Sequence, residues 1–288
     1  MPGTRRHWRQ NRLRYNRQLS SPLTAMTALA IPASILAALT LADPSWRPIL
    51  LAGLEAVAAA DPAYLPALAV DDYLPTEGRL FAAFALPIDA VEYVLVGEGP
   101  YPRAASATGV CFMDGAVGAL WSEAGLSKPV NRATSLRNFM KMLLLADGQL
   151  ALDATSGAAL APVASRARAD GGGTVQTLSQ LQDNLSGHGF LLLNAALVFR
   201  AHVAPVRDAK AWLPFLQVVL AALAERGGRA APTLVLWGKI AEQVKRLPAA
   251  ARLPQLQSEH PYNLSFIDNP VMLSLFGPMR LLRAGAPS

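Results

Sequence analysis

The stretch Val94–Arg103, VLVGEGPYPR, decides the fold of this chain, together with Gly109–Phe112, GVCF, which follows after a short loop. An apolar run that ends in a turn of glycine and proline is typical of a buried parallel strand that leads into a ligand-binding loop. An ordinary strand-to-loop turn has the same composition, so this segment alone leaves both interpretations open. The remaining segments decide between them.

Short apolar runs alternate along the chain with segments of helical periodicity. Strands are expected at Tyr93–Val96, Phe190–Asn194 and Thr233–Trp237, with a fourth near Leu253–Ser258, where the pattern is poor. Helices are expected at Pro48–Ala59, Arg79–Phe84, Leu136–Leu145, Leu178–Leu185 and Ala209–Glu225. This alternation predicts an α/β protein, a three-layer α/β/α sandwich around a central four-stranded, mainly parallel sheet. The glycine-rich Ala164–Thr174 is expected to be a flexible surface connection.

The composition favours one domain that needs neither a metal nor a disulfide. The chain has 288 residues, 52% of them apolar, which suits a single core of about 240 residues with an N-terminal extension. The single cysteine, Cys111, excludes an internal disulfide and a four-thiolate cluster, and it fits a reducing compartment such as the cytoplasm. The four histidines lack the spacing of a zinc site, so no metal and no cofactor are expected.

The positive charge is concentrated at the N-terminus. The net charge is +6, and six arginines precede the first acidic residue, Asp43: Arg5, Arg6, Arg9, Arg12, Arg14 and Arg17. The rest of the chain is formally neutral, so the charge alone does not indicate a DNA-binding surface on the folded body. We expect residues 1–25 to be a disordered basic extension, with salt-sensitive affinity for phosphate, and residues 26–288 to form the domain.

The uncharged segment Leu23–Ala42 has two interpretations. After an arginine-rich arm it resembles a signal peptide or a membrane span, although Pro32 and its alanine and threonine content weaken the second. The alternative that we favour is that translation starts at Met26, or that the arm is an extension outside the fold, with Ile31–Leu41 forming the first helix. We therefore expect no membrane association.

Six segments between about Trp46 and Leu282 resemble the uracil-DNA glycosylase family, in the order in which that family has them. Gly97–Pro102 stands where the family has Gly-Gln-Asp-Pro-Tyr-His, and Ala107–Phe112 resembles its Ala-His-Gly-Leu-Cys-Phe. The others are Ser135–Asn138 for Ser-Leu-Lys-Asn, Phe190–Leu197 for the Leu-Leu-Leu-Asn strand, Leu234–Gly238 for the penultimate strand, and His260–Ser265 for His-Pro-Ser-Pro-Leu-Ser. The resemblance implies a monomer that acts on uracil-containing DNA, single- or double-stranded.

A glycosylase has to flip its base out of the stack, read the base edge and stabilise the departing uracil anion. Phe112 would stack on the base, and the Asn194 amide would accept from uracil N3–H and donate to O4. By the resemblance, Tyr101 would exclude the methyl group of thymine, and His260 would donate to O2 as charge develops. Phe112 as a core aromatic, Asn194 as a strand-end amide and His260 as a solvated loop residue remain open alternatives.

The resemblance also implies contacts with the DNA backbone and the base stack. Leu264 would fill the gap left by the flipped base, since an exposed apolar side chain otherwise lacks a purpose. Ser135 and Ser265 would bind phosphates. Three arginines are possible supports or ordinary surface charges: Arg103, Arg132 and Arg137.

The chain departs from the family where the chemistry is most demanding. Gly99 replaces the aspartate that positions water, Pro102 replaces the following histidine, and Tyr262-Asn263 replaces Ser-Pro. Glu98 stands where the thermophilic iron–sulfur glycosylases have a glutamate, although a single cysteine excludes their cluster. We expect Glu98 and His260 to be the catalytic residues of a uracil-DNA glycosylase with reduced or altered activity. The alternative is a catalytically degenerate glycosylase fold that binds DNA, a flipped base or a protein without cleavage.

Overall fold

The computed structural model describes residues 31–227 and 229–285, and its centre is a sheet of four parallel strands. The strand order is β4-β1-β5-β6. The strands are β1 Tyr93–Gly97, β4 Phe190–Asn194, β5 Thr233–Trp237 and β6 Gln255–Ser258. The four strands expected from the sequence are therefore confirmed, including the poorly patterned fourth, and the sheet is parallel throughout.

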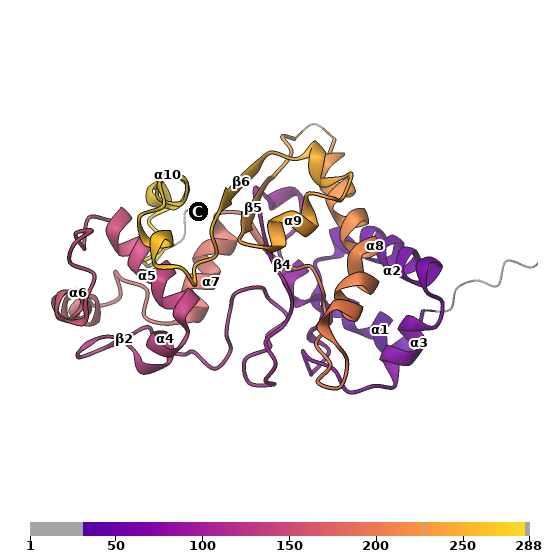
Figure 1. Cartoon of the computed structure of the whole chain (residues 1–288), viewed down its shortest axis with the longest axis horizontal. Helices are drawn as coiled ribbons and strands as arrows, with labels where there is room; N and C mark the ends of the chain where they lie inside the picture. The colour runs from indigo at the N-terminus through magenta and orange to yellow at the C-terminus, as the bar shows by residue number, and fades with distance from the viewer. Residues whose placement is uncertain (1–30, 228, 286–288) are drawn as a thin grey trace, which may run out of the picture. The chain divides into compact units, whose positions relative to one another are not determined.

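Alternate side chains of β1, β4 and β5 enter two separate cores, one on each face of the sheet. In β1, Val94 and Val96 lie in the first core and Leu95 in the second, which is the period-two alternation of a strand buried on both faces. The helices that cover the first face are α1 Ala33–Ala37, α2 Arg47–Ala60, α3 Tyr64–Ala69, α8 Pro205–Ala224 and α9 Ile240–Val244. Those that cover the second are α4 Lys128–Arg132, α5 Thr134–Ala146, α6 Gly157–Ala169, α7 Leu178–Gly187 and α10 Pro270–Phe276. Figure 1 shows this arrangement, with α2 and α8 side by side, and the predicted three-layer sandwich is confirmed.

Short elements connect these layers. A hairpin joins β2 Trp121–Ser122 to β3 Gly125–Leu126. The 3₁₀ segments are Ala38–Leu41, Pro44–Trp46, Arg79–Ala85, Ile88–Ala90, Ala250–Arg252, Leu264–Asp268 and Gly277–Met279. The expected helix at Arg79–Phe84 is one of these, because Phe81 and Phe84 have non-helical backbone angles.

The prediction of a flexible connection at Ala164–Thr174 is wrong for its first half. Residues up to Ala169 belong to α6, which buries Val163, Ala164 and Ala167 against the second core. Only the following turn uses the glycines, and Gly171 and Gly172 have positive φ angles there. The glycine run suggested a linker, but the residues before it continue α6, with Ala164 and Ala167 on its buried face.

At the N-terminal end, the expected helix Ile31–Leu41 is α1 followed by a 3₁₀ turn. The predicted basic extension 1–25, the proposed start at Met26 and the first part of Leu23–Ala42 lie outside the described residues. No helix in the described part of the chain has the length and apolarity needed to cross a bilayer.

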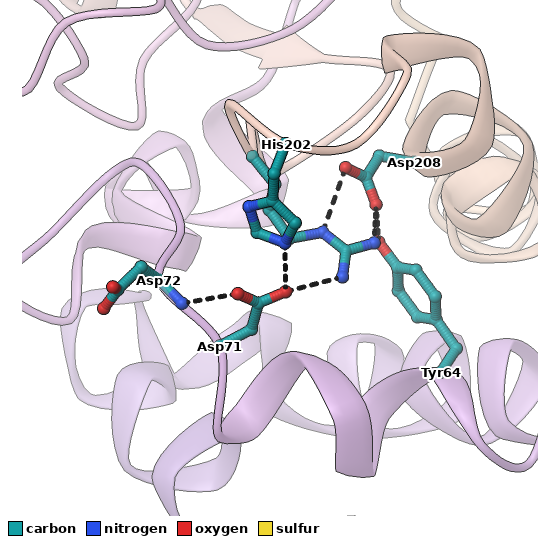
Figure 2. A network of polar contacts seen from close by, with 6 residues as sticks. Tyr64, Asp71, Asp72, His202 and Asp208 are labelled. Carbon is teal, nitrogen blue, oxygen red and sulfur yellow. Dashed lines mark hydrogen bonds and ion pairs between the residues drawn. The ribbon is translucent and has the colours of Figure 1, made fainter.

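An ion network anchors the loop between β4 and α8. Arg200 in this loop donates to Asp208 of α8 at 2.6 Å and to Asp71, which follows α3, at 3.0 Å. The Tyr64 hydroxyl donates to Asp208 at 2.8 Å, and His202 lies 3.1 Å from Asp71. Figure 2 shows the carboxylates of Asp71 and Asp208 and the hydroxyl of Tyr64 gathered around one guanidinium group, that of Arg200. Moving Arg200 away would leave two carboxylates without their positive partner, which is costly. The network therefore holds the loop that begins just after Asn194 in one position.

Candidate functional site

The carboxyl ends of the four parallel strands meet at one edge of the sheet, where ligand sites of open α/β sheets form. A cavity of about 200 Å³ lies there. Six of the eight predicted site residues line it: Glu98, Tyr101, Phe112, Ser135, Asn194 and His260. The other two, Leu264 and Ser265, do not line it and lie on the following 3₁₀ segment, where the Leu264 side chain is 69% exposed. The cavity is below the range of about 300–1,000 Å³ typical of pockets for drug-sized ligands, so its size suits a small ring.

Asn194 is the last residue of β4, and it is buried. Its amide has no hydrogen-bond partner within residues 31–227 and 229–285, although it lines the cavity. Its polar atoms are not among the fully buried unpaired ones, so a ligand or water in the cavity can reach them. Both a donor and an acceptor are therefore available to a bound molecule at this strand end.

Gly97, the residue of β1 opposite Asn194, makes room for that amide. A Cβ atom on Gly97 would lie 2.5 Å from Cys111 Sγ and 2.9 Å from Asn194 Oδ1, both too close for any side chain. The loops beyond the strands continue the pairing, since the Ala195 and Ala196 N–H groups donate to the Gly97 and Glu98 carbonyls at 2.8 and 3.1 Å. Backbone hydrogen bonds thus hold the first motif loop against the end of β4.

Phe112 forms a side of the cavity in a backbone conformation that side chains rarely adopt. Its φ angle is +68°, and the Tyr101 hydroxyl donates to its carbonyl at 3.4 Å. Its ring packs in T-shaped arrangements with Phe139 and Trp237, at centroid distances of 5.3 and 5.2 Å. Strained backbone that persists because the surroundings fix it is characteristic of functional sites. Burial raises the pKa of Tyr101, so the ring stays neutral beside the cavity.

Cys111 is a structural residue of the same segment. Its N–H group donates to the Leu192 carbonyl at 3.0 Å, and burial raises the pKa of its thiol to about 12. The thiol is therefore neutral and a poor nucleophile.

His260 follows β6, and a backbone hydrogen bond fixes its tautomer. The Tyr262 N–H group donates to Nδ1 at 3.1 Å, so the neutral ring carries its proton on Nε2. Burial lowers the pKa of His260, and the nearby charge of Glu98 opposes this shift. Gly238 lets the backbone after β5 lie close to His260. Its φ is +68°, and a Cβ atom on it would lie 2.8 Å from His260 Cβ. The site thus contains a neutral imidazole with one N–H donor, next to a carboxylate.

Asn138 is a positioning residue that the sequence analysis missed. Its side-chain nitrogen, buried under the His260–Ser265 loop, donates to the carbonyls of Pro261 at 2.8 Å, Asn263 at 3.3 Å and Tyr262 at 3.4 Å. The resemblance of Ser135–Asn138 to a phosphate-contact segment pointed to this region but not to this contact. The amide holds the loop that carries His260.

Two of the three arginines considered as phosphate supports have contacts within the protein. Arg103 lies 3.6 Å from Asp114, and Arg137 donates to the Asn131 carbonyl at 3.2 Å. Arg132 ends α4 and is exposed.

Proteins of known name are similar in sequence to this chain over most of its length. The uracil-DNA glycosylase of Corynebacterium glutamicum is 30% identical over 223 residues, 77% of this chain and 80% of the relative. That of Mycobacterium tuberculosis is 29% identical over 194 residues, 67% of this chain and 68% of the relative. The crystal structure of wild-type UNG from Nitratifractor salsuginis has 41% identity and a TM-score of 0.78, covering 87% of this chain and 97% of that one. No protein-family model matches the sequence. The extent of these similarities, on a fold with its cavity at the strand ends, shows that the chain belongs to the uracil-DNA glycosylase family.

Proposed function

We propose that this protein removes uracil from DNA by hydrolysing the N-glycosidic bond, as the first step of base-excision repair. The observation that carries the proposal is the amide of Asn194, unpartnered among the described residues, in the same cavity as the neutral imidazole of His260. A uracil ring offers N3–H and O4 to the amide, whereas cytosine presents the opposite pattern at that edge. The names of the relatives support the same activity.

The cavity residues divide the work between recognition and bond breaking. Phe112 stacks on the flipped base, and the ring of Tyr101 occupies the space that a thymine methyl group would need. As the bond between C1′ and N1 breaks, its electron pair moves into the uracil ring, and the Nε2–H of His260 donates to O2. Water adds to C1′, and Glu98, at the mouth of the cavity, accepts its proton.

Other residues around the cavity hold the DNA, and one of them affects the rate of excision. Ser135, at the cavity, and Ser265 bind phosphates, and the exposed Leu264 enters the space that the base leaves. Gly99 offers no carboxylate next to Glu98, so we expect excision to be slower than with an aspartate at this position. The enzyme acts as a cytoplasmic monomer without a metal ion, and EDTA is expected to leave its rate unchanged.

The test is direct. The full chain is incubated with an oligonucleotide that contains one uracil, and alkali then cleaves the abasic sites formed. His260→Ala, purified in parallel, controls for contaminating glycosylase of the expression host, and a thymine oligonucleotide controls for specificity. Abasic sites with the wild type alone support the proposal. Selective binding of uracil-DNA without abasic sites would instead establish the degenerate, binding-only function.

A further inference from the structure

The loop that carries His260 also carries an exposed aromatic side chain. Tyr262 is 68% exposed, and Leu264, two residues further along, is 69% exposed. Every other aromatic residue in the described part of the chain is buried or half-buried. Two large exposed side chains thus lie on one loop, within four residues of the histidine that lines the cavity.

The backbone of this loop is fixed without the Tyr262 side chain. The Tyr262 N–H group donates to His260 Nδ1 at 3.1 Å, and the Tyr262 carbonyl accepts from the Asn138 amide at 3.4 Å. The Asn263 N–H group closes the turn by donating to the His260 carbonyl at 2.9 Å. A ring with two rotatable bonds on such a backbone loses little conformational freedom when a ligand covers it.

Tyr262 is also a departure from the family. It stands where the His-Pro-Ser-Pro-Leu-Ser loop has its first serine. A serine hydroxyl is one bond beyond Cβ, whereas tyrosine adds a flat ring and carries its hydroxyl much further from the backbone. The tyrosine therefore adds reach and stacking area at this position.

Flipping a base out of a duplex leaves two features for a protein to contact. One is the space in the stack, which the proposed function assigns to Leu264. The other is the base of the partner strand, whose edge has lost its hydrogen bonds. The side chain of Leu264 is short and has no polar atom, so it cannot satisfy that edge. The hydroxyl of Tyr262 both donates and accepts, and its ring can stack on any base.

We propose that Tyr262 enters the duplex beside Leu264 and contacts the base left unpaired opposite the flipped uracil. The ring packs against that base, and the hydroxyl forms a hydrogen bond with its edge. A single strand has no such base, so the preferred substrate is uracil in double-stranded DNA. The inference rests on the proposed function, from which it takes the flipped uracil in the cavity.

Binding to DNA that resists cleavage tests the contact. The ligands contain 2′-fluoro-2′-deoxyuridine, in which the electron-withdrawing fluorine next to C1′ opposes cleavage of the glycosidic bond. Fluorescence anisotropy gives the Kd for a duplex, for the same strand alone, and for a duplex whose partner nucleotide has no base. Tyr262→Ser is expected to weaken binding of the intact duplex by about tenfold, within the usual effect of losing one base–aromatic stack, and to leave the other two Kd values unchanged.

Two further variants complete the experiment. Tyr262→Phe keeps the ring and removes the hydroxyl, so its loss on the intact duplex should be smaller, about threefold. Leu152→Ser, at a residue 58% exposed in the loop between α5 and α6, removes exposed apolar area elsewhere and should change none of the three Kd values. The Tyr262 variants should keep the wild-type melting temperature, because the contacts that fix the loop are made by its main chain.

Three results would overturn the proposal. They are an unchanged Kd of Tyr262→Ser for the intact duplex, equal losses of Tyr262→Ser with and without the partner base, and a wild type that binds the single strand as tightly as the duplex. A Tyr262→Phe protein that binds like the wild type would overturn the hydroxyl contact.

These measurements distinguish the contact from excision. A protein that shows the expected differences in binding but forms no abasic sites in a uracil oligonucleotide refutes excision and keeps the contact of Tyr262. A protein that excises uracil, and whose Tyr262→Ser variant binds all three ligands normally, does the reverse.

Discussion

Asn194 Oδ1 lies 2.9 Å from the point where a Cβ atom on Gly97 would stand, and Cys111 Sγ lies 2.5 Å from it. The backbone of β1 thus touches the amide that we assign to base recognition. Gly97 has an ordinary φ angle, so contact alone excludes a side chain there.

Gly97→Ala is therefore expected to destabilise the protein by about 1–3 kcal/mol, the usual effect of overpacking, and to weaken uracil binding as Asn194 shifts. Thermal unfolding and oligonucleotide binding measure the two effects. Adding Cys111→Ala should restore part of the stability, because it removes the nearer contact. Gly118→Ala, at a glycine with open space around it, is the control. A Gly97→Ala protein with normal stability would contradict the described packing.

Asn194→Asp is expected to relax base choice. A carboxylate accepts hydrogen bonds but cannot donate to uracil O4, so discrimination between uracil and cytosine should fall by about 1–3 kcal/mol. Binding to uracil, cytosine and thymine oligonucleotides at one salt concentration measures it. If Asn194→Asp keeps its preference and Asn194→Ala only lowers the melting temperature, the amide has a structural role alone.

Gly99→Asp is expected to raise uracil excision at least tenfold, which needs about 1.4 kcal/mol of transition-state stabilisation. The position accepts a side chain, since its φ is not positive and a Cβ atom would lie 3.6 Å from the Ala196 carbonyl oxygen. Gly99→Asn, of the same shape without the charge, should give no such gain. Glu98→Gln should reduce the wild-type rate by a comparable factor. A folded Gly99→Asp protein that remains inert would show that the site lacks more than one group.

The pH dependence of excision should show the titration of His260. Burial lowers the pKa of His260 below its ordinary value of 6.5, so the ring stays neutral at pH 6.5. Below the lowered pKa, a proton on Nδ1 would face the Tyr262 N–H group, and activity should fall. The same shift stabilises the fold fully above pH 6.5, and this stability is lost as the pH falls through the lowered pKa. His260→Gln should abolish this acid limb in kcat/KM and His188→Gln should keep it. An unchanged limb in His260→Gln would assign it to another group.

Asn138→Asp is expected to disturb the His260 loop, because a carboxylate oxygen would then face the three carbonyls to which the amide donates. The expected loss of stability is about 1–3 kcal/mol, with a larger fall in kcat than rise in KM. Asn184→Asp is a matched control, since the Asn184 amide also donates to two carbonyls, those of Leu281 and Arg283, outside the cavity. Equal effects of both variants on kcat would mean that Asn138 acts on stability alone.

The central strands could be predicted from the sequence, because their apolar pattern is local. β1, β4 and β5 are apolar runs whose burial on both faces requires them to be central strands, so their positions could be predicted to within a residue. Asn194 could be placed at a strand end by the same pattern, whereas His260 was singled out by the family resemblance, because the strand before it, β6, is only partly buried.

Features that depend on distant contacts could not be predicted. Asn138 donates to carbonyls more than 120 positions along the chain, and nothing near it in sequence indicates this partner. The positive φ of Phe112 is imposed by its neighbours, since its residue type disfavours it. A linker was predicted over the end of α6 because a glycine run follows the helix directly.

If the proposed site is right, base selection depends on the whole parallel sheet. Asn194 ends β4, Glu98 follows β1, and His260 follows β6, so the groups that we propose for base reading and catalysis lie at the ends of different strands of one hydrogen-bonded sheet. Local unfolding of one loop would therefore displace only one of these groups and would leave the others in place around the base. Fidelity should therefore survive warming almost up to the unfolding transition, and errors such as attack on thymine should not increase gradually before it.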